Sequence, residues 1–192
     1  MTKKIYFATQ NKGKYESVKE LLAKYNIEVL HAQIDLPEPR SDDLKVIAKS
    51  KALHAFEQLK KPCIVIDSGF YIHSLNGFPK AFVNLALETI GVKGILKLVK
   101  GLSRKCEFRN CLAYYDKELD EPKYFESPTR GTLLQRPVKP KRVFWGKLHT
   151  IFLPENSKKT FAQMTEKEIE EWQEKNKGEE FADNFAKWFL AR

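Results

Sequence analysis

Residues 5–25 constrain the fold more than any other stretch, because they join a strand to a helix through a tight polar turn. The apolar run 5–8 has the composition of a short strand, and the turn 9–14, TQNKGK, follows it directly. A helix comes next, with apolar residues at i, i+3, i+4 and i+7, namely Val18, Leu21, Leu22 and Tyr25. The pattern predicts a strand–turn–helix unit at the start of the chain.

The turn has the features of a phosphate-binding site. A helix that begins after such a turn points backbone N–H groups and the positive end of its dipole at one place. Lys12 and Lys14 add positive charge there, and Thr9 and Asn11 add hydrogen-bonding groups. An ordinary strand–helix connection with a solvated pair of lysines explains the same residues, because Gly/Asn turns are common in that setting.

The chain is long enough for one sizeable domain, with 192 residues and 22.3 kDa. Its 34 Lys and Arg against 25 Asp and Glu give a net charge of +9. This charge favours polyanionic partners such as nucleotides, nucleic acid or an acidic surface. Because the charge is spread over the whole chain, a basic protein without such a partner remains an alternative.

The cysteines and the hydropathy indicate a cytoplasmic protein. The chain has three cysteines and no C-x-x-C pair among them, namely Cys63, Cys106 and Cys111. We therefore expect neither a disulfide framework nor a zinc site, and we expect the protein to reside in a reducing compartment. The apolar run near the N-terminus is too short for a signal peptide. No apolar run approaches the roughly 20 residues of a membrane helix, and we expect no membrane association.

The remaining chain alternates between strand and helix patterns. Strands are predicted at 28–36, 63–66, 105–115, 122–127 and 147–153. Helices are predicted at 42–59, at 81–99 in two pieces, at 165–175 and at 179–190, where an aromatic stripe marks a core face. Residues 131–142 are predicted as a loop.

Two acidic residues follow predicted strands. Glu38 comes after strand 28–36, and Asp67 comes directly after the apolar run 63–66. Carboxylates at strand ends that face a phosphate cradle suit Mg²⁺, which takes oxygen ligands and bridges phosphates. From spacing alone, a solvated loop acid is the favoured explanation of Glu38. Asp67 follows a buried strand and therefore needs a partner.

Five segments resemble, in order and spacing, the motifs of the inosine triphosphate pyrophosphatase family. They are residues 8–14 (ATQNKGK), 34–38 (IDLPE), 44–52 (LKVIAKSKA), 66–79 (with DSGF and LNGFP) and 151–165 (with IFLP and KTFAQMT). The resemblance covers the chain from Lys4 to about residue 167.

The resemblance implies an α/β fold with an elongated, mixed, curved sheet flanked by helices, and two lobes around a central nucleotide cleft, all within a single domain spanning 1–192. It implies an enzyme that cleaves nucleoside triphosphates between the α- and β-phosphates with Mg²⁺, releasing nucleoside monophosphate and pyrophosphate, and that forms a homodimer. Family substrates are the triphosphates ITP, XTP and dITP.

The resemblance also assigns roles to individual residues. Glu38 and Asp67 would hold the metal, and an attacking water would be activated near Asp67. The phosphates would be held by five residues, of which Lys14 is also a catalytic candidate: Thr9, Asn11, Lys14, Lys51 and Ser68.

The base-reading motifs of the family are altered. An FGYDP-like stretch is replaced by residues 146–150 (GKLHT), and a terminal S-H-R motif falls on residues 173–175 (QEK). His149 and Lys175 are the remaining candidates for contacting the base. A site that has lost its hydrogen-bonding groups loses discrimination, so the preferred base stays open.

The sequence therefore predicts a diverged Mg²⁺-dependent nucleoside triphosphate pyrophosphatase. The alternative is a non-catalytic nucleotide- or nucleic-acid-binding member of the same fold, for which the basic segment 136–142 beside Phe144 and Trp145 argues. A solvated loop is the favoured explanation of that segment, because charge runs usually face water. Nucleic acid is thus a possible partner but not the favoured one.

Overall fold

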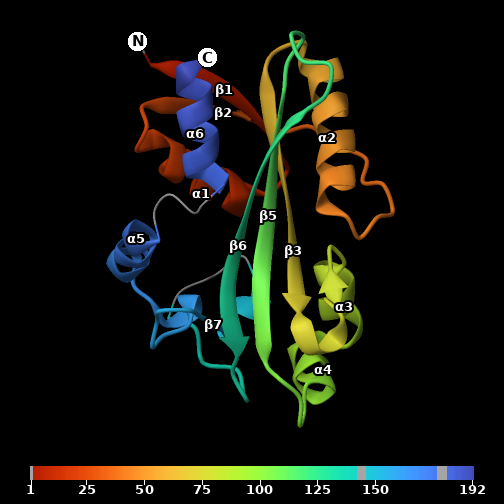
Figure 1. The fold of residues 1–192 in the computed structure, drawn as a ribbon, viewed down its shortest axis with the longest axis vertical. Coiled ribbons are helices and arrows are strands. Elements are labelled where there is room, and N and C mark those ends of the chain that lie inside the picture. Colours follow the sequence, from red (N-terminus) through yellow and green to blue (C-terminus); the bar gives the residue numbers. More distant parts are fainter. Residues whose placement is uncertain (1, 142–145, 177–180) are drawn as a thin grey trace. The chain divides into compact units, whose positions relative to one another are not determined.

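The computed structural model describes residues 2–141, 146–176 and 181–192 and shows a mixed sheet with helices around it (Figure 1). The strands are β1 (Lys3–Ala8), β2 (Ile27–Ala32), β3 (Cys63–Ile72), β4 (Pro79–Lys80), β5 (Lys105–Tyr115), β6 (Lys123–Leu133) and β7 (Phe152–Pro154). The helices are α1 (Lys12–Ala23), α2 (Leu44–Leu59), α3 (Val83–Thr89), α4 (Gly91–Leu98), α5 (Glu166–Lys175) and α6 (Phe181–Ala191). Three short 3₁₀ helices are η1 (His73–Leu75), η2 (Lys147–Thr150) and η3 (Phe161–Gln163).

The sheet has seven strands in the described part of the chain, in the order β2-β1-β3-β5-β6-β7, with β4 paired to β3. β1 pairs in parallel with β2 and β3, whereas β3 with β4 and β6 with β7 are antiparallel. The predicted mixed α/β sheet with flanking helices is confirmed. The nucleotide cleft stays a prediction.

The chain forms two compact units, and the first consists of Met1–Ser68, Asn110–Ser127 and Gly178–Arg192. Its core includes Phe7 and Leu22 from the first strand–turn–helix unit. Helix α6 adds the predicted aromatic stripe, because Phe181, Phe185 and Phe189 are buried there. The predicted start of this helix at residue 179 lies outside the described residues.

The second unit consists of Gly69–Arg109 and Pro128–Lys177. Its core contains Phe70, Ile95, Leu148 and Phe152. The ring of Phe108 packs edge-on against that of Phe152, with centroids 4.9 Å apart. The expectation that residues 1–192 form a single domain stays a prediction.

The third strand is longer than its apolar run indicates. β3 continues from Cys63 to Ile72, so Asp67 lies inside the strand and not at its end. β1 pairs with β3 only through Tyr6 with Cys63 and Phe7 with Ile64. Beyond these pairs β3 continues in the sheet as the neighbour of β5, and it pairs with β4 at Phe70 and Tyr71, so the polar residues after Ile66 do not end the strand.

Three other predicted boundaries were wrong. β2 ends at Ala32, where the N–H of Ile34 donates to the Ala32 carbonyl in a tight turn. The predicted loop 131–142 begins later, because β6 extends to Leu133. The predicted strand 147–153 is the 3₁₀ helix η2 followed by the short β7, and the Thr150 hydroxyl donates to the Lys147 carbonyl at 2.7 Å.

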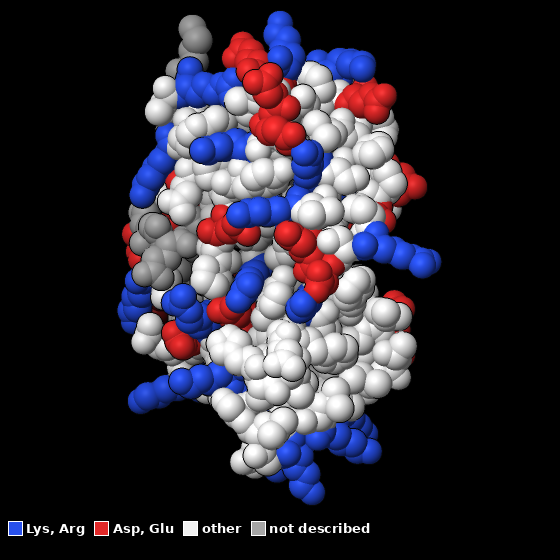
Figure 2. All heavy atoms as spheres, turned by 45° about the vertical axis from the view of Figure 1, so that its right-hand side comes forward, with Lys and Arg blue, Asp and Glu red and all other residues white. Residues whose placement is uncertain are grey.

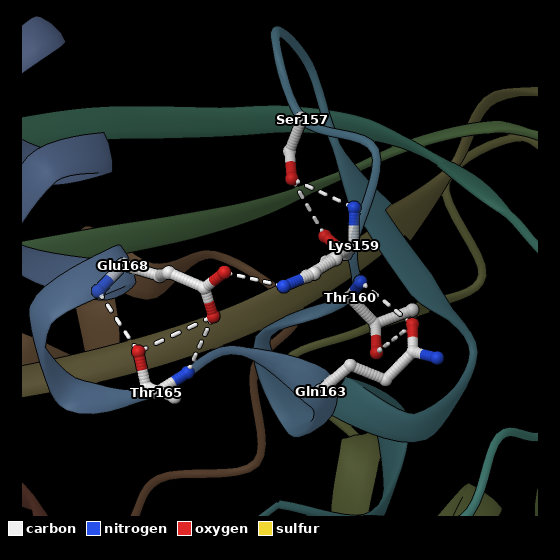
Figure 3. A network of polar contacts seen from close by, with 6 residues as sticks. All are labelled: Ser157, Lys159, Thr160, Gln163, Thr165 and Glu168. Atoms are coloured by element: carbon white, nitrogen blue, oxygen red, sulfur yellow. Dashed lines mark hydrogen bonds and ion pairs between the residues drawn. The ribbon is translucent and has the colours of Figure 1, made fainter.

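Helix ends follow the capping residues of the sequence. α2 begins after Asp43, whose carboxylate accepts from the Lys45 N–H at 2.8 Å. α5 begins with a capping box, in which Thr165 and Glu168 exchange side-chain to backbone hydrogen bonds (Figure 3). Lys159 also pairs with Glu168 there. These contacts anchor α5 within the second unit.

Candidate active site

A buried lysine bridges the two predicted metal ligands. The Lys51 ammonium on α2 donates to Asp67 Oδ1 at 2.8 Å and to Glu38 Oε1. Lys51 and Asp67 are buried, with 9% and 8% of their surface exposed, whereas the Glu38 side chain is 67% exposed. Asp67 therefore has the partner that its burial requires, and the two carboxylates converge on one cation.

The sequence of α2 places Lys51 in this setting. Ile47, Ala48, Ala52 and Ala55 are buried on the same helix, so Lys51 extends from an apolar face. Burial alone lowers the pKa of Lys51, but the carboxylates of Asp67 and Glu38 outweigh it and hold that pKa above its ordinary value. Lys51 is therefore a permanent positive charge between two acids.

Lys14 reaches the same place from the first turn of α1. Its ammonium donates to the carbonyl oxygen of Ile66 at 3.3 Å, next to Asp67 in β3. Burial lowers the pKa of Lys14 below its ordinary value, and the charge of Lys51 lowers it further, against the opposing effect of Asp67. Two lysines and two carboxylates thus form one cluster, with formal charges that cancel.

The turn before α1 is organised by its own polar side chains. The Thr9 hydroxyl oxygen accepts from the Asn11 N–H at 3.1 Å. Asn11 is the N-cap of α1, and its side-chain oxygen accepts from the Lys14 N–H at 3.0 Å. The N–H groups of Lys12 and Gly13 stand in the first helical turn, where backbone donors have no intrahelical acceptor and can bind an anion.

Ser68 has a partner that the sequence did not indicate. Its hydroxyl donates to the side-chain oxygen of Asn110 at 2.8 Å. Asn110 lies in β5, the neighbour of β3 in the sheet. An asparagine within a strand pattern carries no signal of its own, and only the pairing of these strands brings it to the site.

The first unit contains all the residues predicted to hold phosphate or metal. They are Thr9, Asn11, Lys14, Glu38, Lys51, Asp67 and Ser68. The two base-binding candidates belong to the second unit. His149 is 6% exposed, with its ring centroid 5.3 Å from that of Phe108 and 5.7 Å from that of Phe161. Lys175 is exposed in the last turn of α5, and both base-contact roles stay predictions.

The basic segment that favours a binding protein is only partly described. Residues 136–141 form neither helix nor strand, and the basic ones are exposed, as a solvated loop requires. Arg142, Phe144 and Trp145 lie outside the described residues.

The donor set of the cluster fits Mg²⁺. Among the described residues, no group of three or more His, Cys, Asp or Glu side chains is placed to hold a metal ion. Mg²⁺ does not need such a cage, since it is usually held by one or two carboxylates together with waters and substrate phosphates. Glu38 and Asp67, which already converge on one cation, meet that requirement.

Comparison with known sequences finds close relatives. A sequence model described as the Ham1 family matches residues 5–180. The dITP/XTP pyrophosphatase of Methanopyrus kandleri is 37% identical over 187 residues, covering 97% of this chain and 96% of the relative. That of Saccharolobus solfataricus is 34% identical, covering 96% of this chain and 91% of the relative.

Comparison with solved structures finds the same fold. A HAM1 protein from Coxiella burnetii superposes with a TM-score of 0.77 at 20% identity, covering 99% of this chain and all of the other. The Ham1 protein of Staphylococcus aureus superposes with a TM-score of 0.70 at 21% identity, covering 93% of this chain. Among the described helices, none combines the length and the apolar composition that crossing a membrane requires.

Proposed function

The chain belongs to the Ham1 family, and on that premise we propose that it is a nucleoside triphosphate pyrophosphatase. The reaction is hydrolysis between the α- and β-phosphates, which gives a nucleoside monophosphate and pyrophosphate. The relatives named above are dITP/XTP pyrophosphatases, so deoxyinosine and xanthosine triphosphates are the proposed substrates. We place this activity in the cytoplasm, with no membrane involved.

The observation that carries the proposal is the cluster of Lys14, Glu38, Lys51 and Asp67 beside the first turn of α1. This cluster brings together two ammonium groups and a helix N-terminus, which suit phosphate oxygens, and two carboxylates, which suit a divalent cation. A purely structural role would explain the ion pair between Lys51 and Asp67. It would not explain why Lys14 of α1 is held next to that pair.

Glu38 and Asp67 would hold Mg²⁺, which when bound supplies charge neutralisation on the phosphates and Lewis acidity at the reacting phosphorus. Lys51 now occupies the position between these carboxylates. When the triphosphate and Mg²⁺ bind, the Lys51 ammonium would therefore turn from the two carboxylates to the phosphates. The metal ion would then compensate the carboxylates, and the phosphates would compensate Lys51.

The other residues orient the substrate. Lys14 contacts the reacting phosphates and stabilises the negative charge that develops on them. Thr9 and Asn11 hold the turn in shape, so that the first-turn N–H groups meet the phosphates. Asp67 orients the attacking water, and Ser68, held by Asn110, contacts phosphate and supports the strand that carries Asp67.

A substrate screen tests the proposal. Pyrophosphate release from XTP, dITP, ITP, ATP, GTP, CTP and UTP is measured with Mg²⁺ and with EDTA. We expect Mg²⁺-dependent turnover, with XTP and ITP favoured over ATP and GTP by less than about 100-fold in kcat/KM, because the base-reading motifs are altered. A preference well beyond that limit would show that other residues have rebuilt the base site.

The same screen addresses the alternative function. If a folded sample with Mg²⁺ hydrolyses none of these triphosphates, the chain is instead a nucleotide- or nucleic-acid-binding member of the fold. Binding without turnover, lost on neutralising the exposed lysines at 139 and 141, would identify the basic segment as the site of that binding.

We also propose that the enzyme acts as a homodimer, as the resemblance to its family implies.

A further inference from the structure

The carbonyl oxygen of Thr9, where β1 leads into the turn before α1, is held by a side chain and not by the sheet. Ala8 pairs with Ala32 in the parallel ladder of β1 and β2, and the Thr9 N–H donates to the Ala32 carbonyl at 3.1 Å. A regular ladder would next place the Ile34 N–H on the Thr9 carbonyl. The Ile34 N–H donates instead to the Ala32 carbonyl at 3.0 Å, in the tight turn that ends β2. The Thr9 carbonyl therefore takes its hydrogen bond from elsewhere.

His31 of β2 supplies that hydrogen bond. Its Nε2 lies 2.9 Å from the Thr9 carbonyl oxygen, and because a carbonyl only accepts, this nitrogen carries the proton. The imidazole stacks on the ring of Tyr15 in α1, with centroids 4.1 Å apart and an angle of 10° between the planes. The Tyr15 hydroxyl donates to the carbonyl of Val29, also in β2, at 3.3 Å. The hydrogen bond and the stacked tyrosine ring together fix the orientation of the imidazole.

This hydrogen bond also fixes the peptide group between Thr9 and Gln10. That peptide is trans, so its C=O and its N–H point to opposite sides. The sheet order is β2-β1-β3, and a carbonyl turned towards β2 therefore leaves the Gln10 N–H directed to the side of β3. Asp67 lies in β3, and Lys14 reaches the carbonyl of Ile66 there. The Gln10 N–H thus points to the side on which the lysines and carboxylates of the candidate site gather.

Directed donors matter in the first unit, because it has no excess of positive charge. Its three segments contain sixteen Lys and Arg against seventeen Asp and Glu. On α2, Lys45 pairs with Glu126 and Lys49 pairs with Glu121, each at 2.7 Å. Figure 2 shows basic and acidic side chains interspersed over the upper part of the face that it draws. Net charge therefore contributes little to holding a triphosphate in this unit, and the direction of individual N–H and ammonium groups contributes more.

We infer that His31 is a positioning residue for phosphate binding. Held by Tyr15, it keeps the Thr9 carbonyl on the side of β2 and directs the Gln10 N–H at the triphosphate. The inference rests on the proposed function and adds to it a backbone donor and the side chain that orients this donor. His31 acts through the turn and does not itself contact phosphate, so its effect is on the affinity for phosphate and not on the chemical step.

The donor and the ring of His31 can be removed separately. His31→Phe keeps a ring against Tyr15 and removes the donor, whereas His31→Gln restores an N–H donor and removes the ring. Binding of inorganic tripolyphosphate is measured by isothermal titration calorimetry with EDTA, and KM and kcat for XTP are measured with Mg²⁺. We expect His31→Phe to weaken tripolyphosphate binding and to raise KM by about three- to tenfold, as for loss of one hydrogen bond, with kcat changed by less than about twofold. His31→Gln should recover most of the loss.

Two variants serve as controls. Tyr15→Phe keeps the stacked ring and loses only the hydroxyl, and His73→Phe makes the same replacement at an exposed histidine of the second unit. Both should bind tripolyphosphate as the wild type does. Circular dichroism and Tm report the folded fraction of each variant. A purely structural role of His31 would lower Tm and leave the Kd and KM of the folded protein unchanged.

That result would overturn the inference, and so would equal losses of affinity in His31→Phe and His31→Gln, which would assign the effect to the ring. A wild type that binds tripolyphosphate but hydrolyses no nucleoside triphosphate would contradict the proposed function alone, and the Kd values of the variants would still decide the role of His31. A wild type for which neither measurement detects phosphate binding would overturn the role of His31 as well.

Discussion

Lys51 and Asp67 form a buried ion pair, with side chains that are each 11% exposed and charged atoms 2.8 Å apart. Such pairs add little net stability, because desolvation of both charges offsets their attraction. Removing one partner is different, since it leaves a buried charge without compensation. Glu38 continues to contact Lys51 from the solvent side and limits the loss.

Asp67→Asn should therefore reduce stability as well as activity. We expect the free energy of unfolding to fall by about 1–3 kcal/mol, less than for a pair without a third partner. The double variant Asp67→Asn with Lys51→Met should regain most of this loss, because it removes the uncompensated ammonium, and should stay inactive. Urea unfolding and pyrophosphate release measure the two effects. Full activity in Asp67→Asn would disprove its proposed role, and a double variant no more stable than the single one would disprove the electrostatic explanation.

Substitution of Lys14 should lower activity without lowering stability, unlike substitution of Asp67. Its pKa is lowered in the folded chain, so the unfolded chain binds more protons between that pKa and the ordinary 10.5. Stability from this group therefore rises as the pH rises through that window, and at neutral pH the charged Lys14 is unfavourable. Lys14→Met should leave Tm at pH 7 equal or higher.

The same substitution should lower kcat/KM by about tenfold or more, as for loss of a charged contact to the reacting group. Lys19→Met, on the exposed part of the same helix, is the control and should change neither quantity. An unchanged kcat/KM in Lys14→Met would make Lys14 an ordinary helix lysine.

At the scale of single elements, segments with strong periodicity were predicted best. β5 has the predicted bounds, and the helices predicted at 42–59 and 165–175 are α2 and α5, which begin two residues and one residue later than predicted. β3 and the region around η2 were predicted less well, because β3 continues through its neighbours β5 and β4, whereas η2 depends on local hydrogen bonds. Tertiary pairing of this kind leaves no periodic signal in the sequence.

The start of α5 gives a prediction at this scale. The contact from Lys159 and the N–H of Thr165 lower the pKa of Glu168 to about 2 (Figure 3). A carboxylate with a lowered pKa adds stability above its ordinary value near 4.5, and this contribution is lost as the pH falls from there towards 2. When the pH is lowered from 5 to 3, the Tm of Glu168→Gln should therefore fall by less than the Tm of the wild type.

An acid response of Glu168→Gln identical to that of the wild type would show that Glu168 is ionised no more readily in the folded chain than in the unfolded one.

At the scale of the whole molecule, the residues that the resemblance assigned to phosphate and metal lie together in the first unit, and their roles stay predictions. Thr9 to Lys14 form one turn, and Lys51 and Asp67 meet through adjacent elements. The surroundings of the two base-binding candidates were less predictable. His149 is buried among aromatic rings, and this follows from how the second unit packs and not from any motif.

The central claim is hydrolysis between the α- and β-phosphates, and the identity of the products tests it most directly. XTP is incubated with the full chain and Mg²⁺ in ¹⁸O-labelled water, and the products are followed by ³¹P NMR. We predict xanthosine monophosphate and pyrophosphate in equal amounts, and neither product with Asp67→Asn under the same conditions. Release of orthophosphate together with xanthosine diphosphate, or no reaction in a folded sample, would contradict the account.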